Sequence, residues 1–181
     1  MKKIIFTILS IGLFFSASAQ KLLPEIKAGT TLSSHVYVQG QELPLVLTLK
    51  TITAPVVLNW AVDGYGEGSF EMSANALEKG TAIYMGQPGM GLTKLADNET
   101  YGLISKAAFK SLIDTKAFTY NGATFKVKSP ATVMKLGTKE ADVIHVVNDQ
   151  KIELWILNNP NMPLILQTAG LPIDVVVVEI K

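Results

Sequence analysis

The chain has 181 residues, of which 48% are apolar and 17% charged. It contains sixteen basic residues, all of them Lys, and fifteen acidic residues. The absence of Cys excludes thiol catalysis, disulfide scaffolds and Cys-ligated metal centres. The absence of Arg argues against specific nucleic-acid recognition, and the high apolar fraction argues against disorder.

The first nineteen residues have the three-part pattern of a secretory signal. Lys2 and Lys3 precede an apolar stretch, Ile4 to Phe15, and small residues follow up to Ala19. We expect cleavage after Ala19. A retained membrane anchor is the alternative, but the apolar stretch is short for a hydrocarbon layer of about 30 Å. Cleavage removes two Lys and no acid, which leaves fourteen Lys against fifteen acids and a formal net charge of −1.

The expected product is an exported soluble protein, periplasmic or extracellular. No Cys follows the signal for acylation, so a lipoprotein is not expected. The longest later apolar segment, Leu164 to Ile180, is interrupted by Gly170, Pro172 and Asp174, so we expect no transmembrane segment. A net charge near zero gives no electrostatic attraction to nucleic acid or to anionic membranes.

After a short leader, period-two patterns predict four strands joined by short turns. The first alternates around Val36 and Val38, and Leu fills every second position from Leu43 to Leu49. The third covers 56–62, with Trp60 on its apolar face, and the fourth covers 68–73, with Phe70 and Met72 inward. These strands form an antiparallel meander.

The middle of the chain changes character. A Ser at each start predicts helices over 73–79 and 105–116, with Phe109 and Ile113 sharing one apolar stripe of the second. A short strand is predicted at 81–85. The segment from Gly86 through Thr100 is predicted to be a loop.

The last third returns to strands. Asn121-Gly122 predicts a hairpin over 118–127, and strands follow at 142–147, 151–157, 163–167 and 173–180. The unbroken apolar run from Val175 to Val178 predicts a strand buried on both faces. Because no linker separates the two meanders, 20–181 is predicted to be a single β-rich domain.

Few residues suggest chemistry. His35 and His145 could share a metal or serve as a base, but each lies in a strand pattern, where a satisfied polar histidine is the simpler interpretation. The glycines of Asp63 to Gly68 resemble a phosphate loop, yet no helix follows, so a hairpin turn is favoured. Asp97 and Glu99 lack the spacing of a calcium loop.

Two further sets of residues could form a functional site. Four strand acids could supply a glycosidase pair, although nothing selects two of them: Glu67, Glu71, Glu153 and Glu179. The scattered methionines could bind cuprous ion, but filling a core or a lipid-accommodating cavity explains them better: Met72, Met85, Met90, Met134 and Met162.

The stretch from Glu153 to Leu166 (ELWILNNPNMPLIL) places a Trp strand, a polar turn and a returning Pro-Leu strand one after another. With the signal ending Ala-Ser-Ala-Gln, it is similar to exported β-rich proteins of Bacteroidetes-type bacteria, a domain of unknown function. The resemblance implies a curved antiparallel sheet wrapped around short helices, as in lipoprotein-carrier (LolA-like) half-barrels. It carries over no functional residue.

We therefore predict an α+β, mostly β fold: a curved antiparallel sheet or open barrel of two meanders, with one or two short helices packed on it. The favoured function is non-catalytic binding of a lipid or other hydrophobic ligand on the concave sheet, with no cofactor or metal. The candidate wall residues, which ordinary core packing also explains, are Leu45, Leu47, Trp60, Met85, Phe109 and Trp155.

Two other functions stay open. The first is a cell-envelope or extracellular interaction module that binds a protein partner through the segment Gly86 to Tyr101. The second is a hydrolase, whose two carboxylates would lie about 5–10 Å apart across a cleft.

Overall fold

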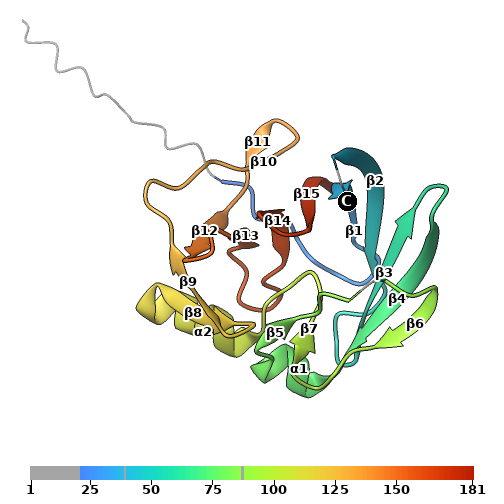
Figure 1. Cartoon of the computed structure of the whole chain (residues 1–181), viewed down its shortest axis with the longest axis horizontal. Coiled ribbons are helices and arrows are strands. Elements are labelled where there is room, and N and C mark those ends of the chain that lie inside the picture. The colour runs from blue at the N-terminus through green and yellow to red at the C-terminus, as the bar shows by residue number, and fades with distance from the viewer. Residues whose placement is uncertain (1–20, 39, 87) are drawn as a thin grey trace, which may run out of the picture.

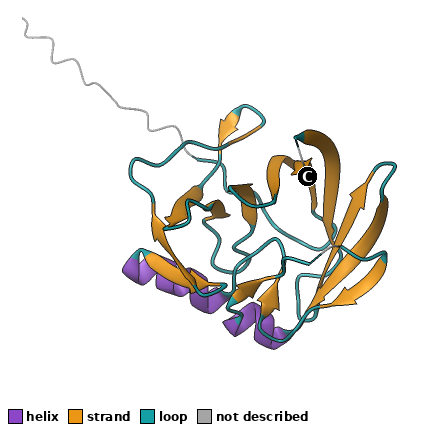
Figure 2. Ribbon diagram, in the orientation of Figure 1, coloured by secondary structure: helices purple, strands orange, loops and turns teal. Residues whose placement is uncertain are grey.

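The computed structural model describes residues 21–181 except Gln39 and Gln87, and the predicted signal, residues 1–19, lies outside the described residues. The described chain is mostly strand and has two helices, as predicted (Figure 2). The helices are α1 (Ala74–Lys79) and α2 (Lys106–Thr115). The strands are β1 (Thr31–Val38), β2 (Gln41–Leu49), β3 (Val56–Val62), β4 (Gly66–Met72), β5 (Ala82–Ile83), β6 (Gly91–Lys94), β7 (Glu99–Thr100), β8 (Ala117–Tyr120), β9 (Ala123–Val127), β10 (Lys135–Leu136), β11 (Lys139–Glu140), β12 (Val143–Asn148), β13 (Glu153–Leu157), β14 (Ile165–Ala169) and β15 (Ile173–Ile180).

One large curved sheet contains eleven of the strands, in the order β6-β4-β3-β2-β1-β15-β14-β13-β12-β9-β8. Neighbouring strands are antiparallel except β4 and β6, which run parallel. Within the described chain the sheet does not close into a barrel, because β6 and β8 form two separate edges on opposite sides of the molecule (Figure 1).

The two predicted meanders meet along a single seam. β1 to β4 form the first, and β8, β9 and β12 to β15 form the second. β1 pairs with β15 over most of its length, from Leu32 opposite Ile180 to Val38 opposite Ile173. This pairing joins the first and last strands of the described chain, and it turns the two meanders into one continuous sheet.

The segment between the meanders carries both helices along one side of the molecule (Figure 1). Ser73 and Ser105 cap α1 and α2, because each hydroxyl accepts a hydrogen bond from the backbone N–H three residues later. β5 and β7 form a small parallel pair beside the helices. The segment thereby bridges the end of the first meander and the start of the second.

The buried side chains form two clusters. The larger cluster lies under the β1–β4 meander and reaches the second meander through residues such as Trp155, Leu157 and Leu166. The smaller cluster lies between α2 and the strands β8, β9, β12 and β13, and it contains Phe109 and Leu112 of the helix. In each cluster, apolar side chains from distant parts of the chain therefore pack against one another.

Three expectations about local structure were wrong. Ile113 does not join the buried stripe of α2 and is 40% exposed. The buried stripe consists of Ala108, Phe109 and Leu112 and spans about 100° of the helix surface, and Ile113 lies outside that arc.

The second error concerns β15, which is not buried on both faces. Val177 is buried but Val178 is 37% exposed, since only one face of this strand meets the core.

The third error concerns the segment after Gly86. It is not a continuous loop, because it contributes β6 beside β4 and β7 beside β5. Both strands are short and pair in parallel with distant residues. Such strands have too few residues to show a period, so the sequence pattern could not indicate them.

Candidate functional site

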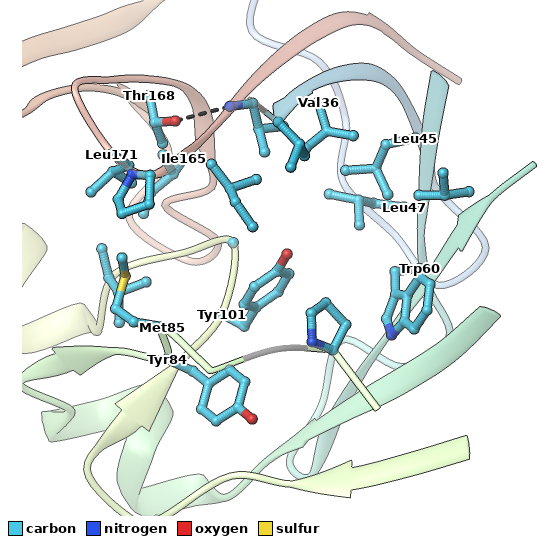
Figure 3. A pocket seen from close by; sticks show the side chains of 18 of the residues that line it. Val36, Leu45, Leu47, Trp60, Tyr84, Met85, Tyr101, Ile165, Thr168 and Leu171 are labelled. Carbon is cyan, nitrogen blue, oxygen red and sulfur yellow. Dashed lines mark hydrogen bonds between the residues drawn. The ribbon is translucent and has the colours of Figure 1, made fainter. Parts of the chain in front are cut away.

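An apolar pocket of about 310 Å³ lies inside the curve of the first meander. Its floor is formed by side chains of β1, β2 and β3 that are at most 8% exposed: Val36, Leu45, Leu47 and Trp60. Ile165 and the β14–β15 turn form one side wall, and the segments around Tyr84 and Tyr101 form the other (Figure 3). Strands from both meanders thus contribute to the cavity.

Period-two geometry explains the floor. Side chains at alternate positions of a strand share one face, so Leu43, Leu45 and Leu47 of β2 all point to the same side. The antiparallel register then places Leu47 opposite Trp60. Val36 of β1 lies opposite Leu43. The sheet therefore has a continuous apolar surface at this site even without a bound ligand.

The pocket opens to solvent through an apolar rim. Tyr65 and Met85 both line the pocket and are 61% and 53% exposed. Pro88, Pro172 and Ile173 are also exposed lining residues. None of the described residues that line the pocket carries a charge. A ligand that enters here replaces its contacts with water by contacts with uncharged, mostly apolar side chains, from the rim to the floor.

The wall that carries Ile83 and Met85 is fastened by the hairpin turn of the second meander. The Asn121 side chain accepts a hydrogen bond from the Ile83 N–H at 2.8 Å and donates one to the Ile83 carbonyl at 3.1 Å. The Tyr84 N–H donates to the carbonyl of Thr100 at 2.8 Å. One asparagine thereby holds a pocket wall that lies 38 residues away in sequence.

Tyr101 supplies a polar atom inside the pocket. Its hydroxyl points into the space between Ile165 and Leu47 (Figure 3). It has no hydrogen-bond partner among the described residues. Burial raises the pKa of the Tyr101 phenol, so the group stays protonated and remains a donor.

Two other polar side chains at the pocket differ from Tyr101. Thr168 is already engaged, because its hydroxyl donates to Asp174 Oδ1 at 3.0 Å and accepts from the Val175 N–H at 2.9 Å. The Trp60 indole N–H is buried without a partner in the described chain. It lies against Gly68, where an added Cβ would come within 2.8 Å of the indole nitrogen. Gly68 therefore allows the indole to lie close to β4.

Four of the six predicted wall residues line this pocket, namely Leu45, Leu47, Trp60 and Met85. Phe109 and Trp155 lie elsewhere. Phe109 is buried in the smaller cluster under α2. Trp155 packs in the larger cluster, with its indole stacked on the His145 ring at a centroid distance of 3.9 Å. Both are large apolar side chains on buried faces, but those faces point into core and not into the cavity.

The sequence did not indicate Tyr101, Ile165 or the β14–β15 turn as part of a ligand pocket, and Tyr101 was considered only as the end of the partner-binding segment Gly86 to Tyr101. Tyr101 follows a two-residue strand and belongs to no periodic pattern. Ile165 comes from the opposite meander, and its approach to the floor depends on the seam between β1 and β15. Among the lining residues outside the predicted wall set, Val36, Val38 and Leu43 carried a usable signal, because each lies on the apolar face of a predicted strand.

The two histidines lie in different places, with three strands of the sheet between them. His35 forms a half-exposed pair with Glu42, at 2.8 Å from Nδ1 to Oε1. His145 is buried: its Nδ1 accepts from the Thr132 N–H at 3.0 Å, and its Nε2 lies 2.6 Å from Glu153 Oε2. In the described part of the chain, no three or more His, Asp or Glu residues gather as a metal site would require.

The acids and the glycine-rich turn have structural roles. Lys94 pairs with Glu71, Lys128 with Glu153, and Lys181 with Glu179. None of the four acids considered for a glycosidase pair is among the described residues that line the pocket. Gly64 lies in the turn between β3 and β4, as the hairpin interpretation predicts, whereas Gly66 and Gly68 already belong to β4.

Comparisons with known protein families, with curated proteins and with solved structures find no match to this chain. Among the described residues, no helix has both the length and the apolar character to cross a membrane. The function must therefore be argued from the pocket.

Proposed function

We propose that this protein is a non-catalytic binding protein that holds a hydrophobic ligand in the pocket on the β1–β3 face. The observation that carries the proposal is a solvent-open cavity whose described lining is uncharged from rim to floor. Its volume of about 310 Å³ lies at the small end of the range for ligand pockets. Each Å² of apolar ligand surface buried there contributes about 25 cal/mol, which drives binding without any charged contact.

Export and the resemblance to lipoprotein-carrier (LolA-like) half-barrels belong to the same proposal. The signal-like first nineteen residues support export to a periplasmic or extracellular compartment. A curved, unclosed sheet is the architecture that this resemblance implies. A carrier for apolar molecules has a clear use outside the cytoplasm, because such molecules cross aqueous spaces poorly unless their surface is covered.

Native mass spectrometry of the protein purified from an exporting cell tests these points together. We expect the mass of a chain that starts at Gln20, accompanied by a species that carries a bound lipid or other apolar molecule. A protein that is empty and also fails to take up a fluorescent apolar probe would contradict the binding function. A chain that retains residues 1–19 would contradict the expected cleavage without touching the binding function.

Filling the cavity should abolish binding. Leu43 lines the pocket on β2, so Leu43→Trp places an indole in the ligand's space. Val46 lies on the opposite face of the same strand and is 43% exposed, so Val46→Trp is the matched control. We expect Leu43→Trp to lower probe affinity at least tenfold and Val46→Trp to leave it unchanged, as measured by fluorescence titration. Equal affinities for the two variants would show that the probe binds elsewhere.

A second function is favoured by a different surface. Met90 and Leu92 are 79% and 54% exposed, and Leu92 lies on β6, one edge of the large sheet. Exposed apolar side chains beside a sheet edge suit a protein partner that adds a strand. Cross-linking in the native host tests this interaction module, and recovery of the monomer alone would argue against it.

A further inference from the structure

The hydroxyl of Tyr101 is a feature that a pure hydrocarbon ligand would leave unused. It points into the pocket and has no hydrogen-bond partner in the described chain (Figure 3). Leaving a desolvated hydroxyl unpaired is unfavourable, because it loses its bond to water and gains nothing in return. A ligand that displaces water from this site therefore gains if it restores the lost bond.

The phenol is held in one orientation by the core behind it. The Tyr101 ring packs on the Phe70 ring at a centroid distance of 4.1 Å, and Phe70 is fully buried. The Tyr101 backbone N–H donates to the Met72 sulfur at 3.3 Å, and Met72 is also fully buried. Because β4 fixes both contacts, the hydroxyl is presented to the cavity before a ligand arrives, so little freedom is lost on binding.

From this geometry we propose that the ligand is an uncharged amphiphile: an apolar body with one oxygen, such as an ester, amide or ketone carbonyl, that accepts a hydrogen bond from the Tyr101 hydroxyl inside the pocket. The inference rests on the proposed binding function and adds the chemical class of the ligand.

The lining disfavours a charged head group at this depth. No Lys, His, Asp or Glu is among the described lining residues, so a carboxylate or an ammonium would lose its hydration without gaining a counter-ion. Tyr101 itself remains a neutral donor, because burial raises its pKa. A neutral carbonyl needs one donor, and the pocket supplies one there.

Three small ligands of similar size separate the contributions of apolar burial, of the hydrogen bond to Tyr101 and of ligand charge to the affinity. Butylbenzene is the hydrocarbon, butyrophenone has the same carbon skeleton with a carbonyl, and para-butylbenzoate carries a charge. Their affinities can be measured at neutral pH by calorimetry on the wild type, on Tyr101→Phe and on the control Tyr37→Phe. Tyr101→Phe keeps the ring that packs on Phe70, and Tyr37→Phe removes a hydroxyl from a half-exposed tyrosine that does not line the pocket.

We expect Tyr101→Phe to weaken butyrophenone about threefold to tenfold, the effect of one neutral hydrogen bond, and to leave butylbenzene unchanged. Tyr37→Phe should alter the affinity for neither ligand. Para-butylbenzoate should bind the wild type more weakly than butyrophenone. If Tyr101→Phe weakens both neutral ligands equally or neither of them, the inference about the oxygen is wrong and the binding function stands. If no neutral ligand binds the wild type, the proposed function itself fails.

A measurement on the wild type alone covers the case in which Tyr101→Phe does not fold. The carbonyl stretching band of bound butyrophenone should lie at lower frequency than the band of the ketone in a hydrocarbon solvent, because a hydrogen bond weakens the C=O bond. An unshifted band would overturn the inference.

Discussion

The imidazole of His145 connects three parts of the chain. It accepts from Thr132 in the loop after β9, contacts Glu153 on β13, and stacks on Trp155, its cross-strand neighbour. Because Nδ1 accepts a hydrogen bond from an N–H, the ring proton must lie on Nε2, which donates to Glu153. The Trp155 indole N–H donates to the Thr132 carbonyl at 3.1 Å and completes the attachment of the loop. This histidine is therefore a positioning residue for the loop.

The same contacts make stability depend on pH. Burial lowers the pKa of His145 below its usual 6.5, against the opposing effect of the Glu153 hydrogen bond. The unfolded chain takes up a proton on this ring as the pH falls through 6.5, and the folded protein takes it up only at a lower pH. The unfolded state then binds more protons, so the free energy of unfolding decreases as the pH falls below this value. The hydrogen bonds from Lys128 hold the pKa of Glu153 below its usual 4.5, which adds a further loss below that pH.

Urea unfolding at about pH 7.5 and about pH 5.5 tests this linkage. We expect the wild type to be less stable at the lower pH, and we expect His145→Gln to show a smaller difference between the two conditions. His35→Gln, at the half-exposed pair with Glu42, controls for the loss of an imidazole. An unchanged pH dependence in His145→Gln would show that another group controls the acid sensitivity.

At the scale of elements, the β8–β9 hairpin has a role beyond its own turn. Asn121 and Gly122 have φ angles of 49° and 73°, the left-handed pair that a tight two-residue turn requires. The Asn121 side chain then bonds both backbone groups of Ile83 in β5, which lines the pocket. The turn thus links the second meander to the wall of the ligand site.

Asn121→Gly separates the two roles, because glycine keeps the turn geometry and loses only the side chain. We expect a loss of about 1 kcal/mol in stability and faster hydrogen exchange at the Ile83 amide. Ligand affinity should also fall, because the wall becomes less fixed. Gly122→Ala provides the comparison, since it strains the turn and leaves Asn121 in place. Unchanged exchange at Ile83 in Asn121→Gly would contradict a clamping role.

At the scale of the whole molecule, the β1–β15 seam decides whether the two meanders unfold as one unit. The larger buried cluster contains Trp60 from the first meander and Trp155 from the second, so the seam runs across a shared core. A core that both meanders need favours a single cooperative transition.

Single-tryptophan variants can test this cooperativity. Trp155→Phe leaves Trp60 as the reporter of the first meander, and Trp60→Phe leaves Trp155 as the reporter of the second. In each variant we expect the fluorescence transition in urea to coincide with the transition followed by circular dichroism. Two separated midpoints in either variant would show that the meanders unfold independently.

The features that depend on neighbouring residues could be predicted from the amino-acid sequence. Alternation from Leu43 to Leu49 fixed a strand and its buried face, Ser105 fixed a helix start, and Asn121-Gly122 fixed a turn. These signals are local because strand alternation, helix capping and left-handed φ angles act over a few residues. The same alternation supplied the pocket floor, which is why Leu45, Leu47 and Trp60 could be predicted.

Which apolar faces meet could be seen only in the folded protein. Alternation does not specify a strand's partner, so the pairing of β1 with β15 and the approach of Ile165 to Val36 have no local signal. Tyr101 lies outside any periodic element, and its contacts with Phe70 and Met72 of β4 hold it with its hydroxyl toward the cavity. Phe109 and Trp155 were assigned to the pocket because an apolar face looks the same in sequence whether it meets a core or a cavity. That distinction depends on what lies opposite the face, and folding brings those opposing residues from distant parts of the chain.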